Sequence, residues 1–131
     1  MKPLSYLLLL AFPLLLSCSD PARIDGFDST QWQQDKNGCQ GTRQQMARDF
    51  ERIRLDLYGR PEADIKDILG KPDGEQLMSR GQRLFLYYLE PGMQCDQRNK
   101  LSEANRAEVR FNALNNVSEI TYLRPIPIKP Q

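Results

Sequence analysis

The chain starts with an apolar run, and the part of the chain that we expect to fold follows this run. Lys2 is the only charge before this run, which extends from Leu4 to Leu16 with few interruptions. A basic start, a short apolar core and a small residue at its end are typical of a secretory signal peptide. A transmembrane anchor is the alternative, but crossing a bilayer takes about 20 apolar residues. We therefore expect residues 1–17 to be a signal peptide that is removed on export.

The end of the apolar run carries a more specific pattern. Leu15-Leu16-Ser17-Cys18 resembles the lipobox of bacterial lipoproteins, in which a small residue precedes a cysteine. The resemblance implies that the Cys18 thiol is acylated and that Cys18 becomes the lipid-bearing N-terminus. An ordinary secreted protein with a cysteine near its cleavage point is the alternative. Each buried methylene contributes about 0.8 kcal/mol, so several acyl chains together would hold the protein firmly on a membrane.

The residues after Cys18 indicate which membrane would hold the anchor. Ser19 follows the cysteine, where an Asp would resemble an inner-membrane retention signal, and Asp20 comes one place later. We expect the protein to be lipid-anchored in the outer membrane and to face the periplasm. The outer leaflet of the inner membrane is the alternative.

The nearly neutral charge of the chain argues against a nucleic-acid partner. The chain has 18 Lys and Arg residues and 17 Asp and Glu residues. The predicted signal peptide contributes one Lys and no acid, so the mature chain is close to neutral. Nucleic-acid binding needs a basic face that neutralises phosphates, and we expect no nucleic-acid partner. The remaining length is sufficient for one small domain.

Two cysteines remain once Cys18 is assigned to lipid. An even pair of cysteines in an exported protein usually forms a disulfide, which predicts a bond between Cys39 and Cys95. Two free thiols or a metal site are the alternatives. Zinc would need further ligands and the chain contains no His, so we expect no metal.

The first half of the mature chain predicts a tether and two helices. Residues 18–38 are mostly polar, which is typical of a tether, and we expect Phe27 and Trp32 to dock on the domain. Thr42 through Gln45 has the form of a capping box, and a helix is predicted over residues 43–57. The apolar stripe that we expect this helix to bury consists of Met46, Phe50, Ile53 and Leu57. Its arginines, which we expect on the solvated face, are Arg43, Arg48, Arg52 and Arg54. A second, shorter helix is predicted to begin at Pro61 and to end at Gly70.

The second half of the chain predicts strands, because its apolar residues recur with a period of two. The predicted strands are 76–79, 84–89, 108–113 and 118–122, with turns at Arg80-Gly81 and Asn115-Asn116, a loop over 92–106 and an extended tail over 125–131. The expected fold is α+β, with two N-terminal helices packed on an antiparallel meander of three or four strands over residues 39–124. Three aromatic residues of the second strand form a candidate binding surface if they are exposed, and core if they are buried: Phe85, Tyr87 and Tyr88.

A family resemblance covers residues 59–123. The positions that carry it are Gly59, Ile65, Ile68, Leu69-Gly70-Lys71-Pro72, the aromatic residues of the second strand, and Val109, Phe111, Val117 and Ile120. Their order and spacing resemble the BamE (SmpA/OmlA) family of small outer-membrane lipoproteins. The resemblance implies a two-layer α+β fold and a role in the assembly of outer-membrane β-barrels. Pro61 stands where the family usually has Thr or Ser, and neither the cysteine pair nor the arginine-rich helix is a hallmark of the family.

The chemistry of the chain favours binding over catalysis. There is no His, and the two mature cysteines are expected to pair, so the common nucleophile–base pairs are missing. Carboxylate pairs such as Asp64 and Asp67 fall on polar helix faces, where a solvated surface is the usual interpretation. We expect no catalytic residue and no cofactor. The predicted function is a non-catalytic scaffold module with a protein partner in the cell envelope, and the alternatives are a periplasmic inhibitor or sensor, or an enzyme.

Overall fold

The structure is a computed structural model that describes residues 16–127. The signal peptide predicted over residues 1–17 therefore lies almost entirely outside the described residues, as does the end of the predicted tail from residue 128. Between residues 16 and 127, no helix is long and apolar enough to cross a membrane.

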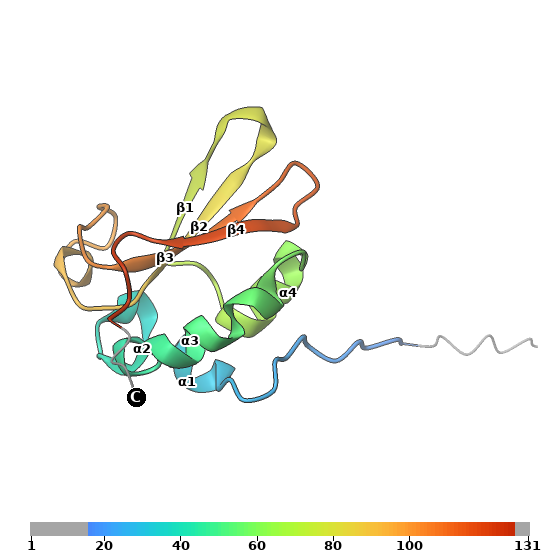
Figure 1. The fold of residues 1–131 in the computed structure, drawn as a ribbon, viewed down its shortest axis with the longest axis horizontal. Helices are drawn as coiled ribbons and strands as arrows, with labels where there is room; N and C mark the ends of the chain where they lie inside the picture. Colours follow the sequence, from blue (N-terminus) through green and yellow to red (C-terminus); the bar gives the residue numbers. More distant parts are fainter. Residues whose placement is uncertain (1–15, 128–131) are drawn as a thin grey trace, which may run out of the picture.

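The described chain is α+β, as predicted, with short helices on one face of an antiparallel sheet (Figure 1). The α-helices are α1 Ser29–Gln34, α2 Thr42–Gln45, α3 Ala47–Ile53 and α4 Glu62–Leu69. The strands are β1 Gly74–Leu77, β2 Arg83–Tyr88, β3 Arg106–Phe111 and β4 Val117–Tyr122. Short 3-10 turns are η1 Lys36–Gly38, η2 Arg54–Leu57, η3 Ser79–Gly81 and η4 Met93–Cys95.

The sheet is a meander of four strands in the order β1-β2-β3-β4, and each neighbouring pair is antiparallel. In its centre Phe85 pairs with Val109, which pairs with Ile120, so all three side chains point to the helices. The edge at β4 is partly covered, because the Gly59 amide donates to the Val117 carbonyl at 2.9 Å. At the opposite edge lies β1.

The folded part of the chain begins earlier than predicted. Residues 29–38 were predicted to be tether, but they form α1 and η1. Trp32 has no exposed surface and stacks on Phe50 with 5.1 Å between the ring centroids, while Phe27 is 8% exposed. Both aromatic residues therefore dock on the domain as predicted. Because Trp32 is a central core residue, the domain boundary at residue 39 is wrong.

The helix predicted over residues 43–57 forms as three consecutive segments, α2, α3 and η2. Met46 separates the first two with φ −84° and ψ 0°. The capping box is wrong, because the cap position is Gly41 and no side chain of the cap contributes. The carboxylate of Asp35 takes this role instead, accepting from the amides of Gln40 at 2.7 Å and Arg43 at 2.8 Å. The predicted apolar stripe is buried throughout.

The second predicted helix is confirmed as α4. Pro61 is its N-cap, and Gly70 ends it with φ +79°, a conformation that glycine adopts readily. Its buried face consists of Ile65, Ile68 and Leu69, none of which has exposed surface. So short a helix depends on this burial, since isolated helices of its length are marginal in water.

The predicted strands exist, with shifted ends. The first begins at Gly74 and not at residue 76, and the third ends at Phe111. Ala113, the last residue of the predicted third strand, is exposed in the turn after β3 because that strand ends two residues earlier than predicted. The turn at Asn115 is confirmed, with φ +61°.

Candidate functional site

The predicted lipid attachment residue, Cys18, is exposed and has no disulfide partner. Its neighbours in residues 16–20 are also exposed and form no helix or strand. Among the described residues, the first hydrogen bond to α4 is made by Ala22, whose amide donates to the Asp67 carboxylate at 3.0 Å. Acylation of Cys18 stays a prediction, and the thiol lies outside the packed domain.

The predicted disulfide is confirmed, because Cys39 and Cys95 are bonded. The bond joins the residue after η1 to the last residue of η4, and so it fastens the loop between β2 and β3 to the helical layer. A hydrogen bond beside it joins the same two segments, because the side-chain amide of Gln94 donates to the Asn37 carbonyl at 3.0 Å. Within residues 16–127, no three His, Cys, Asp or Glu side chains are grouped so that they could hold a metal ion.

The predicted binding surface on β2 is wrong, because its three aromatic side chains are core. Phe85 and Tyr87 have no exposed surface and point to the helices, where the Tyr87 hydroxyl donates to the Gly70 carbonyl at 2.9 Å. Burial raises the pKa of Tyr87, and the negative charge of Asp73 raises it further. Tyr88 is only 4% exposed on the other face, where its hydroxyl accepts from the Ser102 amide. Both faces of the strand are buried, one against the helices and the other, at Tyr88, against the loop that precedes β3.

Arg43 lies at the centre of a buried network of hydrogen bonds. It was predicted to lie on the solvated face of its helix, but it is 1% exposed. Its Nη1 atom donates to Asp73 Oδ2 at 2.6 Å and to the Tyr88 carbonyl at 3.2 Å. Its Nε atom donates to the Trp32 carbonyl at 3.1 Å, and the guanidinium lies 5.0 Å from the centre of the Trp32 ring. The prediction for Arg43 is wrong because its ion-pair partner, Asp73, is itself buried and is remote in sequence.

Asp73 connects the helical layer to the sheet. Besides the bond to Arg43, its carboxylate accepts from the Tyr88 amide at 2.8 Å and from the Asn37 amide at 3.0 Å. The side chain is 5% exposed. Three donors therefore use both carboxylate oxygens, and the ion pair stabilises the junction of η1, α2 and β2.

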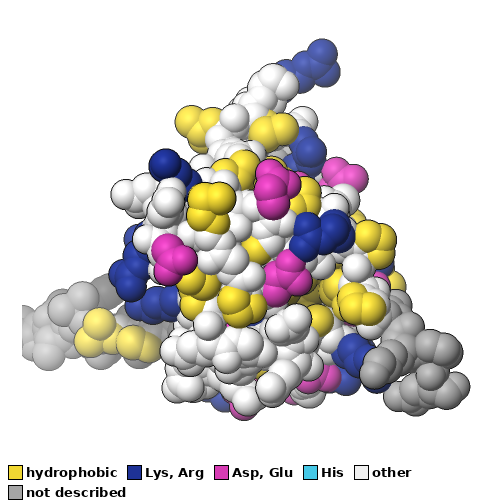
Figure 2. All heavy atoms as spheres, turned by 90° about the vertical axis from the view of Figure 1, so that its left-hand side faces the viewer, with side chains coloured by type: hydrophobic (Ala, Val, Ile, Leu, Met, Phe, Trp, Pro, Cys, Tyr) yellow, Lys and Arg dark blue, Asp and Glu magenta, His cyan; other side chains and the backbone are white. Residues whose placement is uncertain are grey.

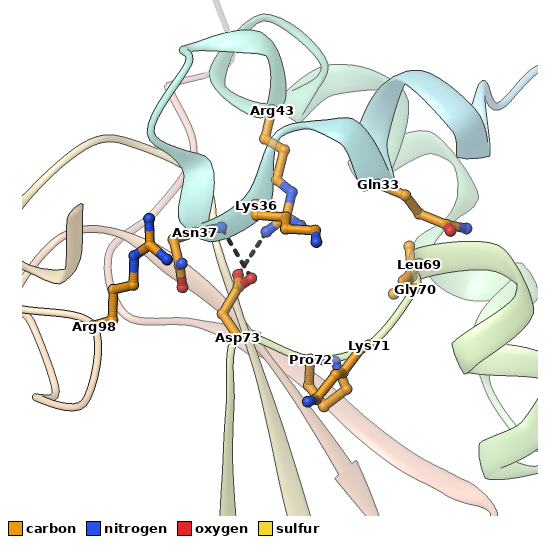
Figure 3. Close-up of a pocket in the computed structure, with 10 residues that line it drawn as sticks. All are labelled: Gln33, Lys36, Asn37, Arg43, Leu69, Gly70, Lys71, Pro72, Asp73 and Arg98. Carbon is orange, nitrogen blue, oxygen red and sulfur yellow. Dashed lines mark hydrogen bonds and ion pairs between the residues drawn. The ribbon is translucent and has the colours of Figure 1, made fainter.

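An open pocket of about 360 Å³ lies beside this ion pair (Figure 3). Its lining residues come from α1, η1, α2, the end of α4, the segment after it and the loop after η4: Gln33, Lys36, Asn37, Arg43, Leu69, Gly70, Lys71, Pro72, Asp73 and Arg98. Three exposed basic side chains, Lys36, Lys71 and Arg98, belong to this lining. We refer to this hollow as the basic pocket.

A different surface lies at the end of the sheet where both hairpins turn. The turn between β1 and β2 projects away from the helices, and the turn between β3 and β4 lies at the same end of the sheet (Figure 1). Leu77 is 82% exposed there, Leu114 80% and Met78 37%. We call these three residues the hairpin-end patch. The face of the molecule shown in Figure 2 instead has basic, acidic and apolar side chains interspersed.

Comparison of the chain with protein-family models, with curated proteins and with solved structures gives no match. The class that the fold and the sites define is therefore a small, disulfide-bonded α+β domain with a four-stranded meander. The resemblance to the BamE family stays a prediction.

Proposed function

We propose that this protein is a periplasm-facing outer-membrane lipoprotein, anchored through Cys18, that acts as a non-catalytic protein-binding module. The observation that carries the binding role is the hairpin-end patch. Single exposed apolar residues are ordinary on protein surfaces. Here Leu77, Met78 and Leu114 lie at one end of the sheet, in or beside turns, where small and polar residues are usual.

The chemistry of this end suits a protein partner. Burying one leucine side chain contributes about 1.5–3 kcal/mol, so a partner that covers both leucines gains appreciable affinity. The neighbouring strand β1 is an edge of the sheet, to which an extended segment of a partner can add as a further strand. Arg80, in the turn between these strands, contributes a positive charge to the rim.

The proposed anchor would hold the domain close to the membrane surface. Only the residues between Cys18 and Ala22 separate the anchor from this first hydrogen bond to α4. Four residues span at most roughly 14 Å when fully extended. A module held in this way would meet partners in or near the membrane. From the resemblance to the BamE family, components of outer-membrane β-barrel assembly are the first partners to test.

Crosslinking in cells tests the proposed surface. A photo-crosslinking amino acid placed at Leu77 or Leu114 is expected to capture an envelope protein, because both side chains would lie in the interface. The matched control is Leu101, which is 53% exposed in the loop before β3. Equal capture from position 101, or no capture from positions 77 and 114, would contradict the proposed function.

A further inference from the structure

The basic pocket has a charge that the rest of the molecule does not share. Its lining contains four basic side chains and one carboxylate, a formal charge of +3, whereas the whole chain has a net charge of +1. The Arg43 and Asp73 charges compensate each other in their buried ion pair. The remaining three positive charges belong to Lys36, Lys71 and Arg98. Over the described residues, none of these three side chains forms an ion pair.

The acceptors around the pocket are already used by the protein. Asp73 accepts three hydrogen bonds, two at Oδ2 and one at Oδ1, so most of the acceptor capacity of its carboxylate is used. The carbonyls at the end of α4 would otherwise disfavour an anion. Two of them have a donor, because the Gln33 side-chain amide bonds the carbonyls of Asp67 at 2.9 Å and Ile68 at 3.3 Å. The pocket therefore offers free cations and few free acceptors.

The walls of the pocket are held in place from several directions. Lys36 and Arg98 lie on segments that the Cys39–Cys95 disulfide joins. Lys71 lies on the segment between α4 and Asp73, whose carboxylate is fixed to η1 by the Asn37 amide. In Figure 3, Lys36 and Lys71 lie on opposite sides of the hollow and Arg98 lies at its edge, beside Asn37. A ligand would thus find its cations on walls whose backbone is fixed in advance.

We propose that the basic pocket binds a phosphate monoester through Lys36, Lys71 and Arg98. A phosphate monoester carries close to two negative charges at neutral pH, whereas a diester carries one. Three cations therefore attract a monoester more strongly than a diester. Arg98 presents a planar fork of donors to phosphate oxygens, while the lysines act as mobile point charges. The pocket, at about 360 Å³, has room for the phosphate and part of the group that carries it. The proposal is independent of the lipid anchor and of the hairpin-end patch.

Titration calorimetry on the purified full chain, in neutral detergent at pH 7.5, tests the proposal with phenyl phosphate as the probe. We expect saturable binding of phenyl phosphate and at least tenfold weaker binding of diethyl phosphate. Dihexanoyl phosphatidic acid distinguishes the source of the group: it should compete with phenyl phosphate if the pocket accepts a monoester on a lipid, and fail to compete if it takes only soluble monoesters. Both results uphold the proposal.

Matched variants separate the pocket from general electrostatics. Arg98→Gln, Lys36→Gln and Lys71→Gln should each weaken phenyl phosphate binding by about tenfold, as expected for a lost charge-assisted hydrogen bond. Arg23→Gln removes the same charge from an exposed side chain outside the pocket lining and should leave binding unchanged. The three pocket side chains are exposed, so these variants should keep the unfolding midpoint of the parent. No saturable binding of phenyl phosphate, equal binding of the diester, or an equal loss in Arg23→Gln would overturn the proposal.

Discussion

Replacing Arg43 by methionine is expected to lower the free energy of unfolding by about 3–5 kcal/mol, because it leaves Asp73 as a buried charge without its partner. The substitution Arg43→Met keeps an apolar side chain in place of the buried guanidinium and its stem. It removes the bonds to the Trp32 and Tyr88 carbonyls as well as the ion pair. Chemical denaturation followed by circular dichroism measures the change.

The matched control is Arg52→Met. Arg52 pairs with Asp49 on the surface, where the two side chains are 59% and 45% exposed. Exposed pairs of this kind contribute about 0–1 kcal/mol. A further test combines Arg43→Met with Asp73→Asn, which removes the unpaired charge and keeps one carbonyl oxygen for the two backbone amides that Asp73 binds. The double variant should lose less than the sum of the single variants. If Arg43→Met loses no more stability than Arg52→Met, the role assigned to the buried ion pair is wrong.

Loss of the Cys39–Cys95 disulfide should have an effect of comparable size. The bond closes a loop of 56 positions along the chain. In the chain-entropy model, a loop of this length corresponds to about 4 kcal/mol of stabilisation. Small domains are typically stable by about 5–15 kcal/mol in total, so Cys39→Ser with Cys95→Ser should leave the domain marginally folded. Equilibrium unfolding of the double variant and of the parent measures the difference.

The third cysteine supplies the control for this prediction. Cys18 is exposed and lies outside the core, so Cys18→Ser should leave the unfolding midpoint of the domain unchanged. Reductant should lower the midpoint of the parent and of Cys18→Ser by the same amount, and should not affect the double variant. An unfolding midpoint of the parent that does not respond to reduction would contradict the stabilising role of the bond.

Much of the core could be predicted from the sequence, because local periodicity reports which side of an element is buried. The spacing of Met46, Phe50, Ile53 and Leu57 identified the buried stripe of the helical layer, although not the break at Met46. The start and stop signals around α4 were likewise local, with proline at its beginning and glycine at its end. The disulfide could be predicted because the chain is expected to be exported and two cysteines remain besides Cys18. Neither argument requires knowledge of the fold.

The polar centre could not be predicted, since it depends on pairs that are remote in sequence. Arg43 and Asp73 are separated by 30 positions, and nothing in the neighbourhood of either residue indicates burial. The burial of β2 on both faces did have a signal, because its continuous apolar run is typical of a strand covered on both sides. The exposure of the two leucines of the hairpin-end patch could not be predicted, because Leu77 continues a strand pattern and Leu114 lies in a turn.

The claim that this is a lipid-anchored envelope module depends most on the state of Cys18. Intact-mass and peptide mass spectrometry of the protein extracted from membranes of a bacterial host tests it most directly. We expect the mature chain to begin at Cys18, to carry the added mass of acyl chains on that residue, and to contain no peptide from residues 1–17. A chain that retains residues 1–17, or one that begins at or near Cys18 without any acyl mass, would contradict it.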